Sequence, residues 1–317
     1  MSEKIYQRDV YGKTLIELGR SSRDIVVFDA DLSSSTRTGM FAKEFPGRFF
    51  NFGVAEQNMM ATATGLASCG KTVFVSTFAI FATGRAWDQV RNSICYSGLN
   101  IKIVASHAGI TVGPDGASHQ ALEDLALMRV IPDLRIIVPC DGPQTREAVL
   151  AAAAEDGPFY IRLGRPKVPT IENKNAFILG KAQVLAEGSD VAIIACGMLV
   201  ARALEASRRL KEKGISARVI NVHTIRPLDA QTILRAAQET RCLVVCEEHA
   251  VIGGLASSID EVVAEHCPVK VVRIGVRNRF GQSGEPDSLL KEYKLTTEDI
   301  ERAVFTGLEK AATCDGP

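Results

Sequence analysis

Short apolar runs rich in Val and Ile alternate with helix-length segments along the whole chain. In the first half the apolar runs are 24–29, 72–76, 101–105, 135–139 and 159–163. The segments between them have helical composition and cover 56–68, 81–94, 120–130 and 143–154. Continuous apolar strands separated by helices are typical of a parallel sheet that is covered on both faces. This alternation predicts an α/β fold.

Two prolines interrupt the pattern in Arg165–Thr170, and the polar Glu172–Asn175 follows. Such a stretch is typical of a connector. The alternation then resumes, with strand-like runs at 191–195, 217–221, 243–246 and 269–274. We therefore expect two domains, each a mostly parallel sheet flanked by helices. Their expected bounds are 1–166 for the first domain, 167–187 for the linker and 188–317 for a second, smaller domain.

Composition narrows the class of protein further. Lys and Arg together number 37, as do Asp and Glu, whereas a nucleic-acid-binding protein usually shows a basic excess. The amino terminus lacks the apolar core of a signal peptide, and no apolar run approaches the length of a membrane span. The eight cysteines include no Cys-x-x-Cys pair. We expect a cytoplasmic protein that binds neither nucleic acid nor membranes and holds no metal through its own residues.

A single carboxylate, Glu56, stands among apolar and small residues at the start of an expected buried helix. The helix dipole favours its ionised form, whereas burial opposes it. A glutamate held between these effects can share a proton with a buried nitrogen base. It could equally be a carboxylate that only caps backbone amides, and this residue alone does not decide between the two.

A glycine-rich loop with two histidines follows the strand at 101–105. The stretch Ser106–Gln120 contains His107, Asp115 and His119 together with three glycines. Glycines let the backbone approach a ligand, and histidines can act as acids, bases or hydrogen-bond donors near neutral pH. The alternative is a structured loop with solvated histidines. Because ligands bind at the carboxyl ends of parallel strands, the loop is a candidate site.

Two aromatic residues, Phe78 and Phe81, end the strand at 72–76. They could form a stacking platform for a flat heterocycle, although packing in the core would explain them as well. The chain has no Gly-x-Gly-x-x-Gly after its first strand, no Walker loop and no Gly-Asp-Gly with a downstream Asn. It therefore has no evident cradle for a diphosphate.

Five motifs taken together closely resemble transketolase, over its pyrimidine-binding domain and its C-terminal domain. They are Asp29-Ala30-Asp31-Leu32, Gly53–Asn58, Ser76–Phe81, Gly113–Gln120 and Met128–Pro132. The resemblance covers essentially the whole chain, but the large N-terminal domain that carries the diphosphate and metal motif is absent. The chain thus resembles the C-terminal subunit of a split transketolase.

The resemblance implies a role for each candidate residue. The glutamate matching Glu56 hydrogen-bonds N1′ of the thiamine diphosphate aminopyrimidine and promotes its reactive tautomer. Residues matching Phe78 and Phe81 pack on that ring, and one matching Asp31 lies close to the cofactor. Those matching Asp115 and His119 contact sugar hydroxyls, the histidine also assisting proton transfer. The substrate phosphate is bound at positions matching Ser35, His107 and Arg165, the last of which can grip it in bidentate fashion.

One departure from the family concerns the ring-binding cup. Transketolases usually have a Tyr shortly after the second Phe, where this chain reads Ala82-Thr83-Gly84-Arg85. The cup must therefore be completed differently. In the second domain, Glu247-Glu248-His249 and His223 with Arg226-Pro227 are interpreted as structural, in a domain that supports assembly more than chemistry.

The resemblance implies thiamine diphosphate and Mg²⁺ as cofactors, held mainly by an N-terminal partner subunit, in a self-associating complex expected to be α2β2. The implied reaction moves a two-carbon unit from a ketose phosphate to an aldose phosphate. The alternatives are half of a 1-deoxyxylulose-5-phosphate synthase, a β-subunit of a 2-oxo acid dehydrogenase, and a non-catalytic scaffold protein that keeps the fold.

Overall fold

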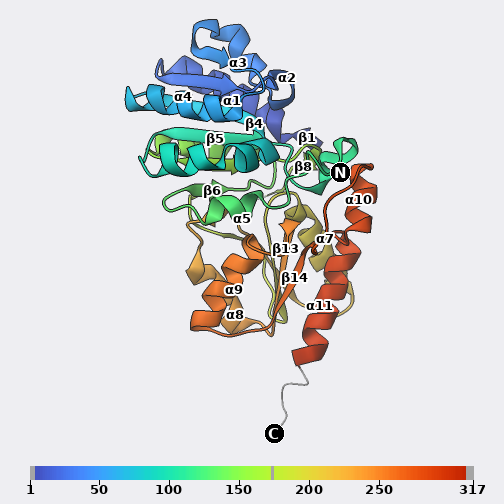
Figure 1. The fold of residues 1–317 in the computed structure, drawn as a ribbon. Coiled ribbons are helices and arrows are strands. Elements are labelled where there is room, and N and C mark those ends of the chain that lie inside the picture. Colours follow the sequence, from blue (N-terminus) through green and yellow to red (C-terminus); the bar gives the residue numbers. More distant parts are fainter. Residues whose placement is uncertain (1–3, 173–174, 312–317) are drawn as a thin grey trace.

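The computed structural model describes residues 4–172 and 175–311, which form two α/β domains stacked one on the other (Figure 1). The first domain is at the top of Figure 1 and the second lies below it. Each contains a sheet whose central strands are parallel and buried. The two-domain α/β architecture expected from the sequence is confirmed.

The first domain is built on a seven-stranded sheet of order β12-β6-β7-β5-β4-β2-β3. Its strands are β2 (Ile25–Asp29), β3 (Phe49–Asn51), β4 (Thr72–Phe78), β5 (Ile101–Ser106), β6 (Arg135–Ile137), β7 (Phe159–Arg162) and β12 (Thr224–Arg226). All neighbours pair in parallel except β12, which is antiparallel to β6. The Val and Ile side chains of the central strands alternate between two cores, as those of a sheet covered on both faces must.

Helices cover both faces of this sheet. They are α1 (Gln7–Ser21), α2 (Ser33–Thr36), α3 (Gly39–Glu44), α4 (Glu56–Ser68), α5 (Asp124–Arg129) and α6 (Gly142–Ala154), with short 3-10 turns η1 (Pro46–Arg48) and η4 (Ile110–Asp115). Helices α1 and α6 pack together on one face, whereas α4 packs beside η3 (Gln89–Cys95) on the other. Helix α4 has the bounds that the sequence predicted.

Two expected helices have a different form. The segment 81–94 contains two π-helical turns, η2 (Phe81–Arg85) and η3, instead of a regular α-helix. Such turns are rare and occur often at functional sites. Of the expected helix at 120–130 only α5 is helical, because the residues before it belong to a loop that the second domain holds by hydrogen bonds.

The second domain has a five-stranded sheet of order β14-β13-β10-β11-β9. The strands are β9 (Gln183–Ala186), β10 (Val191–Ala195), β11 (Ala217–Asn221), β13 (Leu243–Ala250) and β14 (Val271–Val276). The helices are α7 (Leu199–Glu212), α8 (Ala230–Glu239), α9 (Leu255–His266), α10 (Pro286–Glu292) and α11 (Thr297–Ala311). Only β9 runs antiparallel to its neighbour.

The chain between the domains is partly ordered into strands. Strand β8 (Lys167–Pro169), in the segment expected as a linker, pairs antiparallel with β1 (Lys4–Tyr6). Strand β9 joins the second sheet. Strand β12 follows β11 in the chain but joins the first sheet, so the second domain contributes the edge strand of the first.

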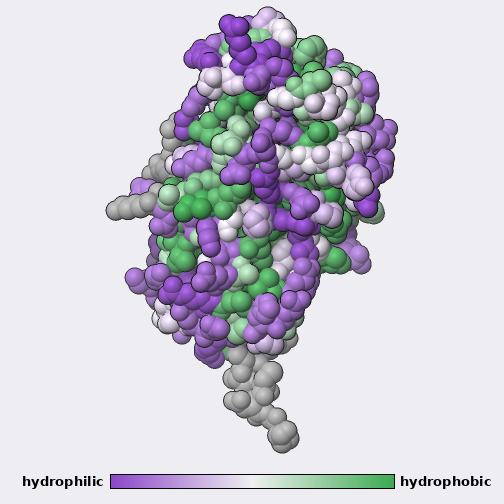
Figure 2. Space-filling model, turned by 90° about the vertical axis from the view of Figure 1, so that its left-hand side faces the viewer, coloured by the Kyte–Doolittle hydropathy of each residue, from purple (hydrophilic) through white to green (hydrophobic). Residues whose placement is uncertain are grey.

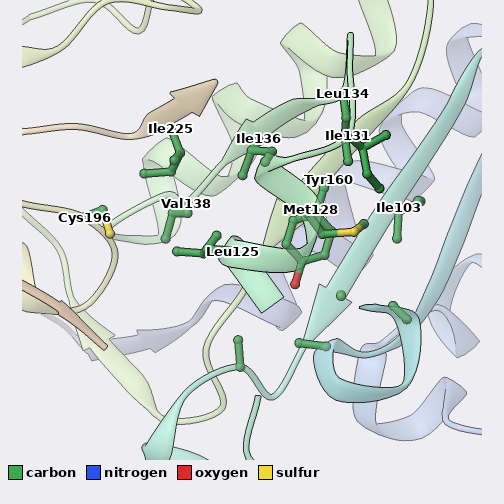
Figure 3. Close-up of a cluster of buried hydrophobic side chains, with 14 of the residues drawn as sticks. Ile103, Leu125, Met128, Ile131, Leu134, Ile136, Val138, Tyr160, Cys196 and Ile225 are labelled. Carbon is green, nitrogen blue, oxygen red and sulfur yellow. The ribbon is translucent and has the colours of Figure 1, made fainter. Parts of the chain in front are cut away.

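One hydrophobic core runs through the junction of the domains. Figure 3 shows its centre, where Leu125 and Met128 of α5 pack near Ile136, Val138 and Tyr160 of the first domain. Cys196 and Ile225, from the second half of the chain, belong to the same cluster. Burial of this continuous apolar surface stabilises the two domains as one unit. Within the residues that the structure describes, no helix is both long and apolar enough to cross a membrane.

Lys102 is fully buried in β5. Its ammonium group donates hydrogen bonds to the carbonyl oxygens of Glu155 (2.6 Å) and Gly157 (2.8 Å), and it lies 4.5 Å from the centre of the Phe159 ring. Burial, with a smaller contribution from Arg135, lowers the pKa of Lys102 to about 7. In the unfolded chain this pKa is ~10.4, so the unfolded state binds more protons between these values and the free energy of unfolding rises with pH there.

Replacing Lys102 with Met should remove this pH dependence. We expect the free energy of unfolding of the wild-type chain, relative to Lys102→Met, to rise by as much as ~1.4 kcal/mol per pH unit from about pH 7 towards pH 10. Urea unfolding across that window measures it. Lys71→Met is the control, because Lys71 pairs with Asp24 at the surface. Parallel curves for the wild-type chain and Lys102→Met would contradict the expectation.

Candidate active site

The candidate residues gather at the carboxyl ends of neighbouring parallel strands. Strands β2, β4 and β5 end at Asp29, Phe78 and Ser106, and their order in the sheet makes them neighbours. The loops that follow these strands, together with the start of α4, therefore meet at one edge of the sheet. The loop that connects β5 to α5 also begins at this edge. We call this loop, residues 107–123, the histidine loop.

Glu56 is the first residue of α4, and its side chain is only 1% exposed. Both of its carboxylate oxygens accept hydrogen bonds from Nη1 of Arg85, at 3.0 and 2.9 Å. The Arg85 side chain is 49% exposed, and its guanidinium lies 4.7 Å from the centre of the Phe81 ring. Among the described residues, the half-exposed cation of Arg85 is thus the side-chain partner of the buried carboxylate and links it to the Phe81 ring.

Arg85 occupies the region where the family tyrosine is missing. It ends the π-helical turn that begins at Phe81, and this turn directs its side chain back to both Glu56 and Phe81. Sequence reasoning did not select Arg85. The available signal was a cation four residues after the second phenylalanine, which a helical spacing would bring near that ring.

Four rings form a connected cluster beside Glu56. Phe78 and Phe81 are stacked with 6.0 Å between their centres and 15° between their planes. The imidazole of His107 stacks on Phe78 at 3.9 Å, whereas His119 meets Phe81 edge-on at 5.3 Å. Phe78, Phe81, His107 and His119 are therefore together in the structure.

His107 is buried and has a positive φ of 58°. Its Nδ1 lies 2.9 Å from the hydroxyl of Ser106. Burial first, and then the nearby charges of Arg8 and Arg165, lower the pKa of His107 to about 3. Its ring is accordingly neutral near pH 7. It can donate one N–H to a ligand but offers no positive charge.

Positive charge beside His107 comes from arginines. Arg165 donates hydrogen bonds to the carbonyl oxygen of Val112 and, at 3.5 Å, to Asp115. Arg8 of α1 donates to the carbonyl oxygen of Ser35 at 3.3 Å, and its Nε is buried without a hydrogen-bond partner among the described residues. Burial, and next the charge of Arg37, lower the pKa of Arg8, with Arg165 acting in the same sense.

These like charges favour a bound anion. Mutual repulsion between guanidinium groups is relieved when an anion lies among them, and guanidinium groups bind phosphate through paired hydrogen bonds. Arg165 contacts Asp115, and its charge acts on Arg8, which contacts Ser35, so these residues lie in one region. Arg8 was missed, because nothing in the sequence of α1 marks one of its cations as lying near His107, 99 positions further along the chain.

Asp31 stands somewhat apart from the rings. It follows β2 with a positive φ of 64°, and its carboxylate accepts a hydrogen bond from the amide of Asn51 at 3.1 Å. Asn51 in turn accepts from the backbone N–H of Asp31 and of Gly53. This pairing fixes the exposed turn before Glu56, on the rim of the site. Among the described residues, no group of three or more His, Cys, Asp or Glu side chains is arranged to hold a metal.

The fold and this site correspond to known domains. Residues 3–170 match the family model described as the transketolase pyrimidine-binding domain, and residues 180–300 match the transketolase C-terminal domain. The chain belongs to the transketolase family and corresponds to its C-terminal section.

Similar proteins agree with this assignment. The chain is 48% identical to a "Putative transketolase C-terminal section" of Methanocaldococcus jannaschii, with 96% of each chain covered. It is 43% identical to a 6-deoxy-6-sulfo-D-fructose transketolase subunit of Clostridium sp. (strain MSTE9), with 97% and 96% covered. A solved structure titled "Split gene transketolase, inactive beta4 tetramer" has a TM-score of 0.88 and 49% identity, covering 97% of this chain and 99% of that one.

The neutral state of His107 can be measured directly. We expect the ring ¹⁵N signals of His107 to stay those of a neutral imidazole between about pH 5 and 8, the range in which an ordinary histidine titrates. His107→Asn assigns the signals. In the unfolded chain His107 takes up a proton below pH ~6.5, whereas in the folded chain it does so only near pH 3. The contribution of His107 to the free energy of unfolding is therefore fully present above pH ~6.5 and falls as the pH drops towards about 3. A midpoint near 6.5 in the folded protein would show the prediction to be wrong.

Proposed function

We propose that this chain is the C-terminal subunit of a thiamine diphosphate-dependent transketolase. It transfers a two-carbon ketol unit from a ketose phosphate to an aldose phosphate, and it acts together with an N-terminal subunit that holds the diphosphate and Mg²⁺. The observation that carries the proposal is the buried carboxylate of Glu56, joined through Arg85 to stacked aromatic rings, in a sequence that lacks the Gly-Asp-Gly motif.

The residues present fit the pyrimidine end of the cofactor. Glu56 is nearly inaccessible to water, so a ring nitrogen that shares a proton with it would form a strong charge-assisted hydrogen bond. Phe78 and Phe81 provide flat apolar surfaces for such a ring. Arg85 contacts both the carboxylate and the Phe81 ring, which supports a role for it in completing the cup where the family tyrosine is absent.

Thiamine diphosphate supplies the nucleophilic carbon and the electron sink that ketol transfer needs. The protein residues orient and move protons around it. Glu56 holds the proton at the pyrimidine nitrogen and so selects the tautomer. His119, next to Phe81 and only partly buried, can exchange a proton with a sugar hydroxyl, and Asp115 lies on the same loop to orient that hydroxyl.

The phosphate end of the proposed substrate is an anion, and cationic side chains lie where it would bind. Arg8 and Arg165 supply charge, Ser35 supplies a hydroxyl, and the neutral ring of His107 supplies one N–H. Because the charges of both arginines act on His107, which stacks on Phe78, they would orient an extended sugar phosphate with its carbonyl end towards the cofactor. A sulfonate, the anion carried by the substrate named for one relative, has similar chemistry.

Self-association and binding of the N-terminal subunit would cover the surface near Glu56. Val54, two residues before Glu56, is 73% exposed, and Phe50 in strand β3 is 46% exposed. On the side of the molecule drawn in Figure 2, hydrophobic residues form patches among hydrophilic ones. A related chain forms a tetramer of its own that is titled inactive, which supports an α2β2 complex in which the second kind of subunit is required for activity.

Reconstitution tests the proposal. We expect the purified chain with thiamine diphosphate and Mg²⁺ to show no ketol transfer, and the addition of a chain that carries Gly-Asp-Gly and a downstream Asn to restore it. Ketose phosphates and sulfonated ketoses should both be tried as donors in a coupled assay. Activity of this chain alone would contradict the need for a partner. Pyruvate consumption with release of carbon dioxide would favour a 1-deoxyxylulose-5-phosphate synthase or 2-oxo acid dehydrogenase subunit instead.

Glu56→Gln tests the proton-holding residue. In the reconstituted complex we expect kcat to fall by roughly 10² or more, the scale of a lost general acid–base contribution, while assembly measured by size-exclusion chromatography is unchanged. Glu17→Gln is the matched control, because Glu17 makes a half-exposed ion pair with Arg146 on the other face of the domain. Turnover near that of the wild type in Glu56→Gln would remove this carboxylate from the mechanism.

A further inference from the structure

The histidine loop is attached to the second domain at three places. Thr111 donates its backbone N–H to Oε1 of Glu248 at 2.7 Å. The carbonyl oxygen of Leu122 accepts a hydrogen bond from the backbone N–H of Ala250 at 2.8 Å. Between these points, the side chain of Gln120 donates to the carbonyl oxygen of Gln282 at 2.9 Å. The loop that carries Asp115 and His119 therefore rests on the second domain along its length.

Glu248 makes the closest of these contacts. Its carboxylate is buried and lies directly against Gly109, where an added Cβ would come within 2.4 Å of the carboxyl carbon. Gly109 also has a φ of +83°, which favours glycine on conformational grounds alone. The loop backbone is thus folded tightly around this one side chain.

A carboxylate in such a position is costly unless hydrogen bonds compensate it. The N–H of Thr111 provides a charge-assisted hydrogen bond, and the buried Arg162 lies close enough to favour the negative charge. Burial nevertheless raises the pKa of Glu248. An apolar side chain would fill this space without the free-energy cost of burying a charge. Packing alone therefore does not explain why a carboxylate is found here.

The contact acts on the candidate active site through one short segment. Thr111 lies near the start of η4, whose backbone is kinked at Gly113 before it ends at Asp115. Val112 in the same turn accepts a hydrogen bond from Arg165, which also contacts Asp115. Arg165 therefore bridges the kink, so holding the N–H of Thr111 also restrains the segment that places Asp115 beside Arg165 and leads on to His119.

We propose that Glu248, in the second domain, is the positioning residue of the histidine loop, holding η4 by its hydrogen bond to Thr111 so that Asp115 and His119 are set for a sugar phosphate. The part concerning the sugar phosphate rests on the proposed function, whereas the restraint on the loop does not. This gives the second domain a direct part in organising the site.

The restraint can be tested on the chain alone by hydrogen–deuterium exchange with Glu248→Asp, Glu248→Gln and Glu248→Ala. Glu248→Asp withdraws the acceptor from Thr111 but keeps the charge, so the amides of residues 109–119 should exchange at least tenfold faster, with those of β10 and β13 unchanged. Glu248→Gln keeps a carbonyl acceptor and should stay close to the wild type. Glu248→Ala should resemble Glu248→Asp, and if it fails to fold, the Asp and Gln variants still decide the question.

Glu247→Ala is the matched control. Glu247 is the neighbouring buried carboxylate, and its oxygens accept from Leu255 and Ala256 at the start of α9. Its loss should speed exchange in α9 and leave residues 109–119 unaffected. Unchanged exchange of the loop in Glu248→Asp, or equal loosening in Glu247→Ala, would overturn the proposal.

The reconstituted complex separates this inference from the proposed function. With an active wild-type complex, Glu248→Asp should lower kcat/KM for the donor sugar at least tenfold and leave the Kd for thiamine diphosphate unchanged, because Glu56, Phe78 and Phe81 are not on the loop. Glu248→Gln should restore kcat/KM. A loosened loop with unchanged kcat/KM overturns the positioning role. A loosened loop in a complex whose wild type transfers no ketol unit overturns the proposed function and supports the restraint alone.

Discussion

The ion pair between Arg162 and Asp124 joins the parts of the molecule that the site depends on. Arg162 ends β7, and its guanidinium donates to both carboxylate oxygens of Asp124 at 2.7 and 3.1 Å. Tyr160 donates a further hydrogen bond to the same carboxylate. The Nη2 of Arg162 also reaches the carbonyl oxygens of Ala121 and Glu248. One buried cation thus ties a strand of the first sheet, the end of the histidine loop, α5 and the second domain.

The buried charges of this ion pair explain why it is difficult to break. Burial alone would raise the pKa of Asp124, but the adjacent Arg162 holds it below its ordinary value. Removing one partner of such a pair leaves a buried charge uncompensated, which typically costs ~3–5 kcal/mol. The candidate site is therefore built on a buried junction between domains, and the more exposed side chains of Arg85 and Arg165 lie at its solvent-facing rim.

The sequence allowed the local elements to be predicted better than the contacts between distant ones. Helix α4 begins at Glu56 and ends at Ser68 as expected, because its small and apolar residues mark a helix and Gly70 follows it. The rings of Phe78 and Phe81 could be placed from the end of one strand. In contrast, Arg8 reaches the site from another element, and Glu248 contacts Thr111 across 137 positions of the chain. Such pairings leave no short-range pattern in the sequence. The motif that contains Glu248 was therefore interpreted as structural only.

The position of strand β12 affects how firmly the two domains are joined. Its three residues come after the second domain has begun, yet they pair with β6 at the edge of the first sheet. Arg226 of this strand also donates to the carbonyl oxygens of Arg129 and Ile131 in the first domain. A protease that cut the connector would nick the polypeptide without parting its halves. Because strand pairing and these hydrogen bonds join the domains in addition to the connector, the described parts of the two domains are held together as one unit.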